Sequence, residues 1–455
     1  MSPDIFRACD IRGHAENDLT DDLVFALGQA FASLIRARRH GARIAVGRDC
    51  RLSGRRIFDA LTAGLQEAGA DVLDIGVVPS PVLYFAAHFL EPDGAVIITG
   101  SHNPGDDNGF KLMCGTDALH GDDIQELRRR VEERDFDDGH GTCTALDVTG
   151  DYESAASAAI ELGKRRFGVV IDAGHGAGGP VALSLYRRLG FDPTPLYCEM
   201  DGRFPAHHPD PTVEANLEDL KAKVMETGAE LGLAFDGDAD RLGAVDGHGR
   251  VLWGDQLMLL FGRAILEDHP GATFIGEVKC SQTLYDGLRS AGGNPIMWKV
   301  GHSPIKAKMR ETGALLAGEM SGHMYFADRY YGFDDGIYAG ARLLELLSRQ
   351  QPTLAELRDQ LPATVTTPEL RIPCPDRLKF EVVERVRETL RDHPEVLEVI
   401  DIDGVRALFA HGWGLVRASN TGALLAVRVE AEDQSYLAAI RAILESAIAN
   451  AKEKP

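Results

Sequence analysis

Short apolar runs alternate with helical stretches along most of this chain. Residues 53–68 place Ile57, Leu61 and Leu65 on one face, at the spacing that a helix requires. Neighbouring runs are rich in β-branched residues and bounded by Gly, Asp or Pro, which is typical of buried strands: 43–49, 71–76 and 94–99. Strands that are joined through helices favour a parallel sheet, so this part of the chain is predicted to be an α/β unit.

The same pattern recurs twice. A second unit starts with the run 167–172 and continues to 231–236 and a hairpin around 246–249. A third begins near Gly254, and its strands are expected at 273–278 and 314–318. Each unit has the size of a small domain, so we expect three related α/β domains in tandem, with mixed sheets.

The pattern changes after Pro362. Residues 364–375, TVTTPELRIPCP, are rich in Pro and Thr, as a linker or a first strand would be. A helix, three strands and a last helix are expected next, at 378–391, 404–409, 413–418, 423–430 and 435–451. Strands clustered between helices favour a smaller α+β domain. The predicted domains are 1–148, 149–250, 251–363 and 364–455.

The charge balance excludes several classes of function. The 455 residues include 48 Lys and Arg against 70 Asp and Glu, a formal net charge of −22, with no long basic run to offset it. Such a surface repels nucleic acid and anionic membranes, although a few well-placed basic side chains can still bind a small anion. We therefore expect small-molecule partners, and neither nucleic acid nor membrane. No long apolar heptad points to a dimer, so a monomer is expected.

Cysteine usage and the first residues predict the compartment. The seven cysteines are scattered, odd in number and never in C-x-x-C spacing, which argues against a disulfide framework or a structural zinc site. The opening residues, MSPDIFRACDIRG, are charged from the fourth position, and no stretch reaches the roughly 18 apolar residues that span a bilayer. We expect a cytoplasmic protein.

The first motif with chemical potential is TGSHNP, residues 99–104. It follows the predicted strand 94–99, at the edge of the sheet where open α/β folds bind ligands. Its Gly and Asn-Pro would present Ser101 on a turn, although an ordinary Ser-Asn-Pro turn explains the residues equally well. His102 is weak evidence for a Ser–His pair, because neighbours in an extended strand point to opposite faces.

The second motif is DGDADR, residues 236–241. Asp236, Asp238 and Asp240 would place three carboxylates in one loop after a strand, which is costly unless a hard cation lies among them. The loop is not an EF-hand, because Arg241 and Gly247 stand where that motif needs Gly and Glu. Three oxygen ligands leave room for water or a phosphate oxygen and suit Mg²⁺; a solvated acidic turn is the alternative.

Two further loops carry polar side chains suited to a sugar phosphate. GEMSGH, residues 318–323, offers Glu319, Ser321 and His323, which can grip hydroxyls and move a proton. RASNTG, residues 417–422, combines a guanidinium with neutral donors, as a phosphate site would. A β-turn with a surface Arg417 explains the second loop equally well.

A glycine-rich stretch at 174–179 fits the dinucleotide fingerprint G-x-G-x-x-G. It follows a predicted strand, precedes a helix near Pro180, and has the acidic Glu199 downstream. Nothing nearby supplies hydride chemistry, so tight packing of a strand against a helix is the favoured interpretation.

Taken together, the motifs resemble those of the α-D-phosphohexomutase family, in its bacterial phosphomannomutase/phosphoglucomutase branch. FRACDIRG at 6–13 is similar to the N-terminal signature of the family, and TGSHNP with NGFK at 108–111 is similar to its phosphoserine loop. DGDADR resembles its metal loop, GEMSGH its sugar loop and RASNTG its phosphate loop. The resemblance runs the length of the chain, and its strength lies in all the motifs occurring in this order.

The resemblance implies four domains around a central cleft and a reversible exchange of hexose 1-phosphate and hexose 6-phosphate. It implies that Ser101 carries a phosphoryl group, and that Mg²⁺ is held by a phosphoserine oxygen and the three aspartates. Glucose 1,6-bisphosphate is the implied activator. The implied catalytic residues are Ser101, Lys111, His323, Arg241, Arg12 and His302. The implied substrate-binding residues are Arg12, Lys279, His302, Glu319, Ser321, His323, Arg417, Ser419, Asn420 and Thr421.

Among these residues, His323 is a candidate acid or base because its ordinary pKa is near 6.5. Lys111 is the other, because a crowded cationic site could tune it. Two departures from the family pattern stand out. Cys9 occupies a position that is usually Tyr, and residues 105–107 are Gly-Asp-Asp instead of apolar or aromatic.

Four other functions stay open from the sequence. A phosphoglucosamine mutase would share the metal and phosphate loops, although GEMSGH favours neutral hexoses. A metal-dependent phosphatase would use the same serine and carboxylates. A dinucleotide-dependent oxidoreductase depends on the stretch 174–179 alone. A non-catalytic sugar-phosphate binder requires that Ser101 is never phosphorylated.

Overall fold

The computed structural model describes residues 5–7, 10–419 and 423–453, and it groups them into two compact units. Unit 1 comprises residues 1–257 and 321–358, and unit 2 comprises residues 258–320 and 359–455. Each unit is therefore built from two separate segments of the chain. Helix α8 (Gly254–Asp268) crosses from the first segment of unit 1 into unit 2. No helix among the described residues is long and apolar enough to cross a membrane.

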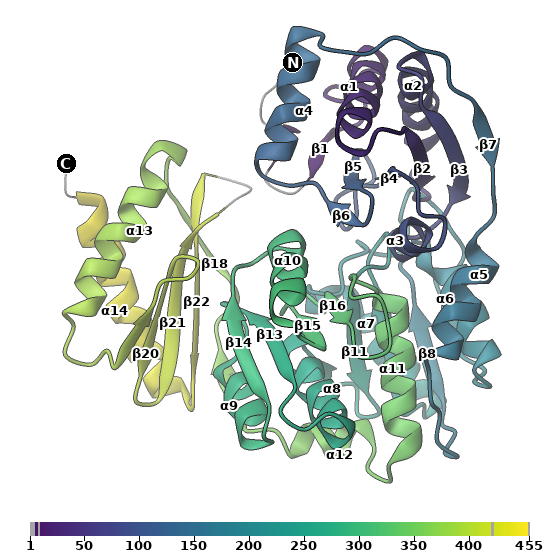
Figure 1. The fold of residues 1–455 in the computed structure, drawn as a ribbon. Helices are drawn as coiled ribbons and strands as arrows, with labels where there is room; N and C mark the ends of the chain where they lie inside the picture. The colour runs from purple at the N-terminus through teal and green to yellow at the C-terminus, as the bar shows by residue number, and fades with distance from the viewer. Residues whose placement is uncertain (1–4, 8–9, 420–422, 454–455) are drawn as a thin grey trace. The chain divides into compact units, whose positions relative to one another are not determined.

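The first sheet of unit 1 is mixed, in the order β1-β5-β4-β2-β3-β7, with β6 paired to β5 (Figure 1). Strands β2, β3, β4 and β7 run parallel, whereas β5 is antiparallel to both β1 and β4. The strands are β1 (Ile11–His14), β2 (Arg43–Arg48), β3 (Asp71–Val77), β4 (Gly94–Ile98), β5 (Asp107–Cys114), β6 (Asp117–Ala118) and β7 (Cys143–Ala145). The helices are α1 (Asp21–Arg39), α2 (Gly54–Glu67), α3 (Ser80–Phe89) and α4 (Asp122–Glu133).

The second sheet of unit 1 has the order β12-β11-β10-β8-β9. Its strands are β8 (Val169–Asp172), β9 (Thr194–Leu196), β10 (Leu231–Phe235), β11 (Leu242–Asp246) and β12 (Val251–Leu252). The remaining elements of unit 1 are α5 (Thr149–Ala158), α6 (Gly178–Arg188), η2 (Glu214–Leu217), α7 (Glu218–Thr227), β16 (Met324–Phe326), α11 (Gly336–Arg349) and α12 (Leu354–Asp359), whose last residue lies in unit 2. Helix α11 begins where the Asp335 carboxylate accepts a hydrogen bond from the main-chain N–H of Tyr338, which is a standard N-cap.

Unit 2 holds a parallel set of strands, β14-β13-β15, and a separate antiparallel sheet. The first set comprises β13 (Thr273–Glu277), β14 (Asn294–Trp298) and β15 (Leu316–Gly318), with helices α9 (Gln282–Ser290) and α10 (His302–Thr312). The antiparallel sheet has the order β17-β22-β21-β20-β19, with β18 also paired to β22. It comprises β17 (Val365–Thr366), β18 (Leu370–Pro373), β19 (Glu398–Ile400), β20 (Val405–Phe409), β21 (Gly412–Ala418) and β22 (Leu424–Ala431).

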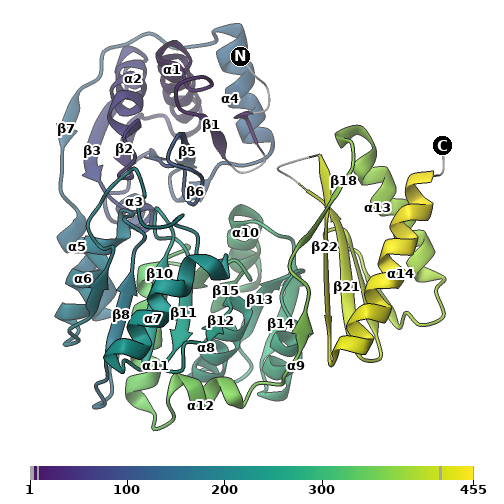
Figure 2. The ribbon, with the colours of Figure 1, turned by 180° about the vertical axis from the view of Figure 1, so that it is seen from behind.

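Helices α13 (Asp376–Arg391) and α14 (Gln434–Glu453) cover one face of the antiparallel sheet, as Figures 1 and 2 show. One apolar core, which includes Val386, Val427 and Leu444, joins both helices to that face. The other face contacts β13 and β14 through a small cluster around Val278, Trp413 and Leu415. The predicted change from α/β to α+β after Pro362 is therefore confirmed, and so are the mixed sheets.

Candidate active site

Ser101 lies in the loop between β4 and β5, where it is buried. Its φ of 49° is in the left-handed region, which is uncommon for a residue with a side chain and is often associated with functional sites. The main-chain N–H donates to Thr99 Oγ1 at 2.8 Å, and the hydroxyl donates to Asp236 Oδ2 at 2.8 Å. The turn therefore directs the serine hydroxyl toward the loop that follows β10.

His102 contacts Ser101, although the sequence argument treated their adjacency as only weak evidence for a Ser–His pair. Its Nδ1 lies 3.2 Å from Ser101 Oγ. The argument was wrong because it assumed an extended backbone, whereas Ser101 has a turn conformation. The positive charge of Arg241, together with burial, lowers the pKa of His102 far below its usual value, so the imidazole is neutral.

Three carboxylates converge in the loop after β10. Asp236, Asp238 and Asp240 are all fully buried, and each offers an oxygen within 4.8 Å of the others. Burial raises the pKa of Asp236 well above its usual value, and the charges of Asp240 and Asp238 raise it further. Among the described residues, Asp238 Oδ1 has no hydrogen-bond partner. Grouped buried carboxylates, with one oxygen unsatisfied and a serine hydroxyl adjacent, suit a hard divalent cation.

Lys111 on β5 contributes a buried positive charge to this group. Its Nζ lies 2.6 Å from Asp238 Oδ2 and also pairs with Asp240 Oδ2. Burial alone would lower the pKa of Lys111, but the charges of Asp238 and Asp240 outweigh it and raise that pKa well above the usual value. Burial would likewise favour the neutral form of Asp240, but Lys111 and His323 together hold its pKa well below the usual value. The prediction that Lys111 lies in a crowded cationic site is thus wrong, because the charged groups nearest to it are carboxylates.

Arg12 lies on β1, the strand paired with β5, and its side chain contacts the serine loop. Its Nη1 donates to Gly100 O at 3.3 Å and to Asn103 Oδ1 at 3.1 Å, and its Nε pairs with Asp10 at 2.6 Å. Cys9, the first departure from the family pattern, lies outside the described residues. The second departure from the family pattern is the Gly-Asp-Asp sequence at 105–107. Within it, the Asp107 carboxylate accepts a hydrogen bond from Asn103 Nδ2 at 3.0 Å.

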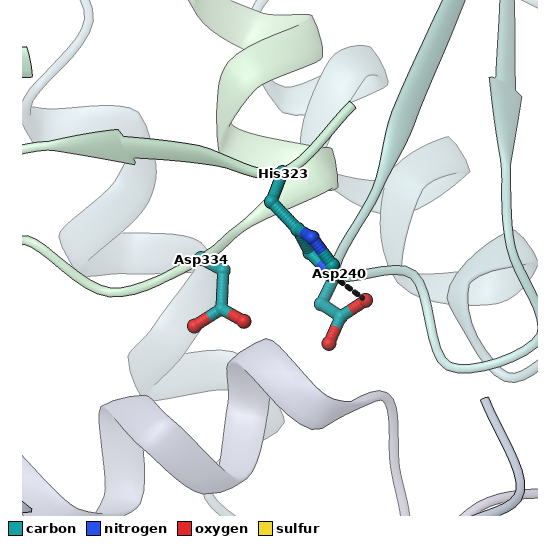
Figure 3. A group of neighbouring side chains, drawn as sticks. All are labelled: Asp240, His323 and Asp334. Atoms are coloured by element: carbon teal, nitrogen blue, oxygen red, sulfur yellow. Dashed lines mark hydrogen bonds and ion pairs between the residues drawn. The ribbon is translucent and has the colours of Figure 1, made fainter. Parts of the chain in front are cut away.

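His323 and Arg241 complete the group in unit 1. The Arg241 main-chain N–H donates to Asp236 Oδ1 at 3.2 Å, and its Nε donates to His323 Nε2 at 3.3 Å. The same His323 nitrogen lies 3.2 Å from Asp240 Oδ1, and Ser321 Oγ lies 3.3 Å from its Nδ1. Figure 3 shows Asp334 on the other side of the imidazole, and all three side chains in that view are buried. The imidazole is thus held between a guanidinium and carboxylates.

A second set of the predicted residues gathers in unit 2. Glu277, at the end of β13, accepts from the main-chain N–H of Lys279 at 2.6 Å and of Met320 at 3.3 Å. Glu319 Oε1 accepts from the N–H of Gly301 at 3.0 Å, which places it at the start of α10 beside His302. Buried carboxylates therefore hold together the loops that carry Lys279, His302 and Glu319.

Arg417 on β21 is also buried, and its Nη2 donates to Asp403 Oδ2 at 3.2 Å. Its Nε has no hydrogen-bond partner among the described residues. The Ser419 carbonyl accepts from Lys379 Nζ at 2.6 Å, while Asn420 and Thr421 lie outside the described residues. A buried guanidinium with an unused donor fits an anion-binding role.

Sequence reasoning missed several residues that position the site. Ser80, the first residue of α3, donates from its hydroxyl to Asp238 Oδ2 at 2.5 Å. Asp49 and Arg51 form a fully buried ion pair whose arginine contacts the serine loop. A charged pair immediately after the apolar strand β2 was a signal that could have found them. Glu277 and Asp403, which contact Lys279 and Arg417, were also missed, and no sequence pattern of this kind marks them.

The glycine-rich stretch 174–179 serves packing, as the sequence analysis favoured. Gly178 begins α6, and a Cβ there would lie only 2.4 Å from the Cβ of Ala239. The N–H of Ala177 donates to Gly237 O at 3.0 Å. The small residues thus allow the start of α6 to contact the carboxylate loop.

Comparisons with known proteins identify the family of the chain. Four family models, described as phosphoglucomutase/phosphomannomutase alpha/beta/alpha domains I, II and III and C-terminal domain, match residues 3–138, 151–249, 253–365 and 369–447. A phosphomannomutase/phosphoglucomutase of Pseudomonas aeruginosa is 44% identical over 97% of this chain and 95% of its own length. The chain belongs to the phosphoglucomutase/phosphomannomutase family. Members of this family are enzymes of the isomerase class that transfer phosphoryl groups.

Two further comparisons point to the same family. A phosphoglucomutase of Neisseria gonorrhoeae is 46% identical and covers 98% of both chains. The crystal structure of a phosphoglucomutase/phosphomannomutase family protein from Burkholderia thailandensis matches with a TM-score of 0.93 at 43% identity, over 100% of this chain and 98% of that one. The family and the buried carboxylate group together support a divalent metal.

Proposed function

We propose that the chain interconverts hexose 1-phosphates and hexose 6-phosphates through a phosphorylated Ser101 and a hexose 1,6-bisphosphate. Its family and its relatives of both mutase names support this activity. The observation that carries the assignment to Ser101 is its hydroxyl, which a strained turn directs to 2.8 Å from the carboxylate group. Transfer between such groups depends mainly on positioning and charge neutralisation.

In the proposed reaction, the bond between phosphorus and Ser101 Oγ breaks as a bond to the free sugar hydroxyl forms. The hydroxyl proton passes to a base, for which His323 is the candidate; Lys111, whose pKa is raised by the neighbouring carboxylates, can serve only as the acid. The bisphosphate then turns over, and its other phosphoryl group returns to Ser101 Oγ, while an acid protonates the sugar oxygen that is released. Arg12 and Arg241 neutralise charge on the moving group, and His302 is proposed to assist catalysis.

Asp236, Asp238, Asp240 and an oxygen of the phosphoserine would hold Mg²⁺. A bound Mg²⁺ would neutralise charge on the phosphoryl oxygens. We further propose glucose 1,6-bisphosphate as the activator, because an enzyme that has lost its phosphoryl group needs a donor to restore it.

Contacts to the substrate are proposed for residues of the GEMSGH and RASNTG loops, together with Lys279 and His302. Glu319 and Ser321 would contact the 3- and 4-hydroxyls, which are alike in glucose and mannose, so both sugars would be accepted. Lys279, His302 and His323 would also contact the substrate. The phosphate that does not react would bind Arg417, Ser419, Asn420 and Thr421, and the unused Nε of Arg417 supports this role.

We also propose that the protein is a cytoplasmic monomer with domain boundaries at 148/149, 250/251 and 363/364. The high net negative charge supports a protein whose partners are small molecules. Size-exclusion chromatography with light scattering would test the monomer, and a dimer would contradict it.

The first test is mass spectrometry of the intact purified protein and its peptides. The expected result is one phosphate on Ser101, which is lost when excess hexose monophosphate is added while a bisphosphate appears. A serine that stays unmodified even after glucose 1,6-bisphosphate is added would overturn the proposal. Release of inorganic phosphate without bisphosphate would instead indicate a phosphatase.

A phosphoglucosamine mutase is the second candidate, because a relative from Methanosarcina barkeri described as a probable phosphoglucosamine mutase is 35% identical over 94% of the chain. Comparing kcat/KM for glucosamine 6-phosphate, glucose 6-phosphate and mannose 6-phosphate separates the two. We expect both neutral hexoses to be preferred over the amino sugar.

A further inference from the structure

Arg51 is a buried cation whose charge is fully balanced. Its side chain has no exposed surface, and its Nε donates to Asp49 Oδ2 at 3.1 Å. Its main-chain N–H donates to the other oxygen of Asp49 at 2.9 Å. The ring of Phe204 lies 5.1 Å from the guanidinium carbon. These contacts fix the plane and the position of the guanidinium.

The two remaining nitrogens of Arg51 donate to main-chain carbonyls of the serine loop and of the first residue of β5. Nη2 donates to the carbonyls of Ser101 at 2.8 Å and Asn103 at 2.6 Å. Nη1 donates to Asp107 O at 2.9 Å and also to Pro104 O. One guanidinium therefore fixes three carbonyls of the serine loop and one at the start of β5, which requires donors in a rigid planar array.

The same ion pair also holds the N-terminal side of Ser101. Thr99 Oγ1 donates to Asp49 Oδ2 at 2.7 Å and accepts from the Ser101 N–H at 2.8 Å. Gly100 has no side chain to interfere, since a Cβ there would lie 2.5 Å from the Arg51 guanidinium carbon. Both the N–H and the carbonyl of Ser101 are thus tied, directly or through Thr99, to the Asp49–Arg51 pair, which can maintain its left-handed conformation.

We propose that Arg51 is a positioning residue for phosphoryl transfer: it holds the Ser101 loop in the one conformation that presents Oγ to the carboxylate group and to the phosphoryl donor. This inference rests on the proposed function of Ser101. Arg51 acts through the loop and contacts no substrate. Without the four carbonyl contacts the loop relaxes, and the transfer rate falls even though the substrate is still bound.

The test is an Arg51→Lys variant. Lysine keeps the charge beside Asp49, but an ammonium cannot reach four carbonyls in one plane. The rate at which dephosphorylated protein takes phosphate from glucose 1,6-bisphosphate is followed by rapid quench and mass spectrometry, together with kcat and KM for glucose 1-phosphate. We expect the phosphorylation rate and kcat to fall by about 100-fold, the loss that a misplacement of about 1 Å can cause. The KM should change by less than about threefold.

Arg342→Lys is the matched control. Arg342 is also buried, donates to both oxygens of Asp328 at 2.7 and 2.8 Å, and lies 4.5 Å from the ring of Phe326. The Arg342→Lys variant should lose thermal stability as Arg51→Lys does. The rate at which its Ser101 takes phosphate should stay within about threefold of the wild-type rate. Similar rate losses in both variants would overturn the inference, because a general loss of packing would then explain them.

Two further results keep the inference separate from the proposed function. If wild-type Ser101 takes phosphate and Arg51→Lys takes it equally fast, the inference fails alone; if the wild type takes none, the proposed function fails. Should Arg51→Lys not fold, Thr99→Val removes the bond to the Ser101 N–H with little change of shape. A slower phosphorylation in Thr99→Val supports the positioning, and an unchanged rate overturns it.

Discussion

The two units differ in the kind of unpaired polar atom that they hold at the proposed site: among the described residues it is a carboxylate oxygen, Asp238 Oδ1, in unit 1 and a guanidinium nitrogen, Arg417 Nε, in unit 2. In unit 1, the hydroxyl of Ser101, the ammonium of Lys111 and the imidazole of His323 each contact a carboxylate of the aspartate loop. In unit 2, Arg417 keeps a buried Nε without a partner among the described residues. The difference teaches that the organised chemical groups of unit 1 have capacity left for a cation, whereas the proposed phosphate site of unit 2 has capacity left for an anion. Substitutions in unit 1 should therefore lower kcat, and those in unit 2 should raise KM.

The largest effect is expected for Ser101→Ala. Removing the group that carries the phosphoryl should reduce kcat by on the order of 10⁴-fold or more, because no other residue replaces a covalent nucleophile. A coupled assay for glucose 6-phosphate formation measures this loss. Activity above a hundredth of the wild-type value would place the transferable phosphate elsewhere.

Metal removal should give the next largest effect. Treatment with a chelator should abolish activity, and added Mg²⁺ should restore it and raise the melting temperature of the wild-type protein. Asp238→Asn should weaken that rise in melting temperature, because it removes one of three carboxylates. Asp328→Asn, a buried aspartate outside the carboxylate loop, is the control and should keep the metal-dependent rise.

Arg417→Ala tests the half of the comparison that concerns unit 2. A lost charge-assisted pair of hydrogen bonds is worth about 1.5–3 kcal/mol, so the KM for glucose 1-phosphate should rise roughly 10- to 150-fold. The kcat should change much less. Arg441→Ala, at an exposed position of helix α14, is the control and should leave both constants unchanged. A fall in kcat at constant KM would break the division between the two units.

The smallest expected effect is on the pH dependence of stability, and it comes from the pair of His207 and Asp172, which lies outside the proposed site. Burial alone would lower the pKa of His207, but its hydrogen bond to Asp172 raises it above the usual value. A raised histidine pKa means that the pair stabilises the fold fully below the unfolded pKa of about 6.5. That stabilisation is lost as the pH rises through the folded pKa.

His207→Gln should therefore destabilise the protein at pH 5.5 by less than about 1 kcal/mol, and by a smaller amount at pH 8.5. Urea unfolding at the two pH values measures the difference. A larger destabilisation at the higher pH would contradict the assignment.

The sequence predicted the loops that carry the chemistry better than the contacts that hold them. TGSHNP and DGDADR each follow a strand, so their placement at strand ends was predictable from periodicity alone. The bonds from Arg51 to the serine loop and to the start of β5 join residues 50–56 apart, and the bond from Ser80 to Asp238 joins residues 158 apart. No local pattern records such pairings, because they arise only when separate strands and helices pack.

The surroundings of Lys111 illustrate the same limit. Its nearest partners, Asp238 and Asp240, lie in the loop between β10 and β11 of the second sheet, whereas Lys111 lies on a strand of the first. The sign of the charge around a residue thus depends on which sheets meet, and that is decided by tertiary packing. The His102 contact was missed for a different reason, since a left-handed serine cannot be read from an extended-strand pattern.

The discontinuity of unit 1 has a consequence for synthesis on the ribosome. Arg12, Ser101 and Asp240 are made early, but His323 and helix α11 belong to the same unit and emerge only after residues 258–320 of unit 2. Domains fold as units during translation, and here one unit is interrupted by part of the other. A nascent chain that ends before His323 therefore exposes an aspartate loop without its imidazole partner, and the reactive constellation is completed only late in translation.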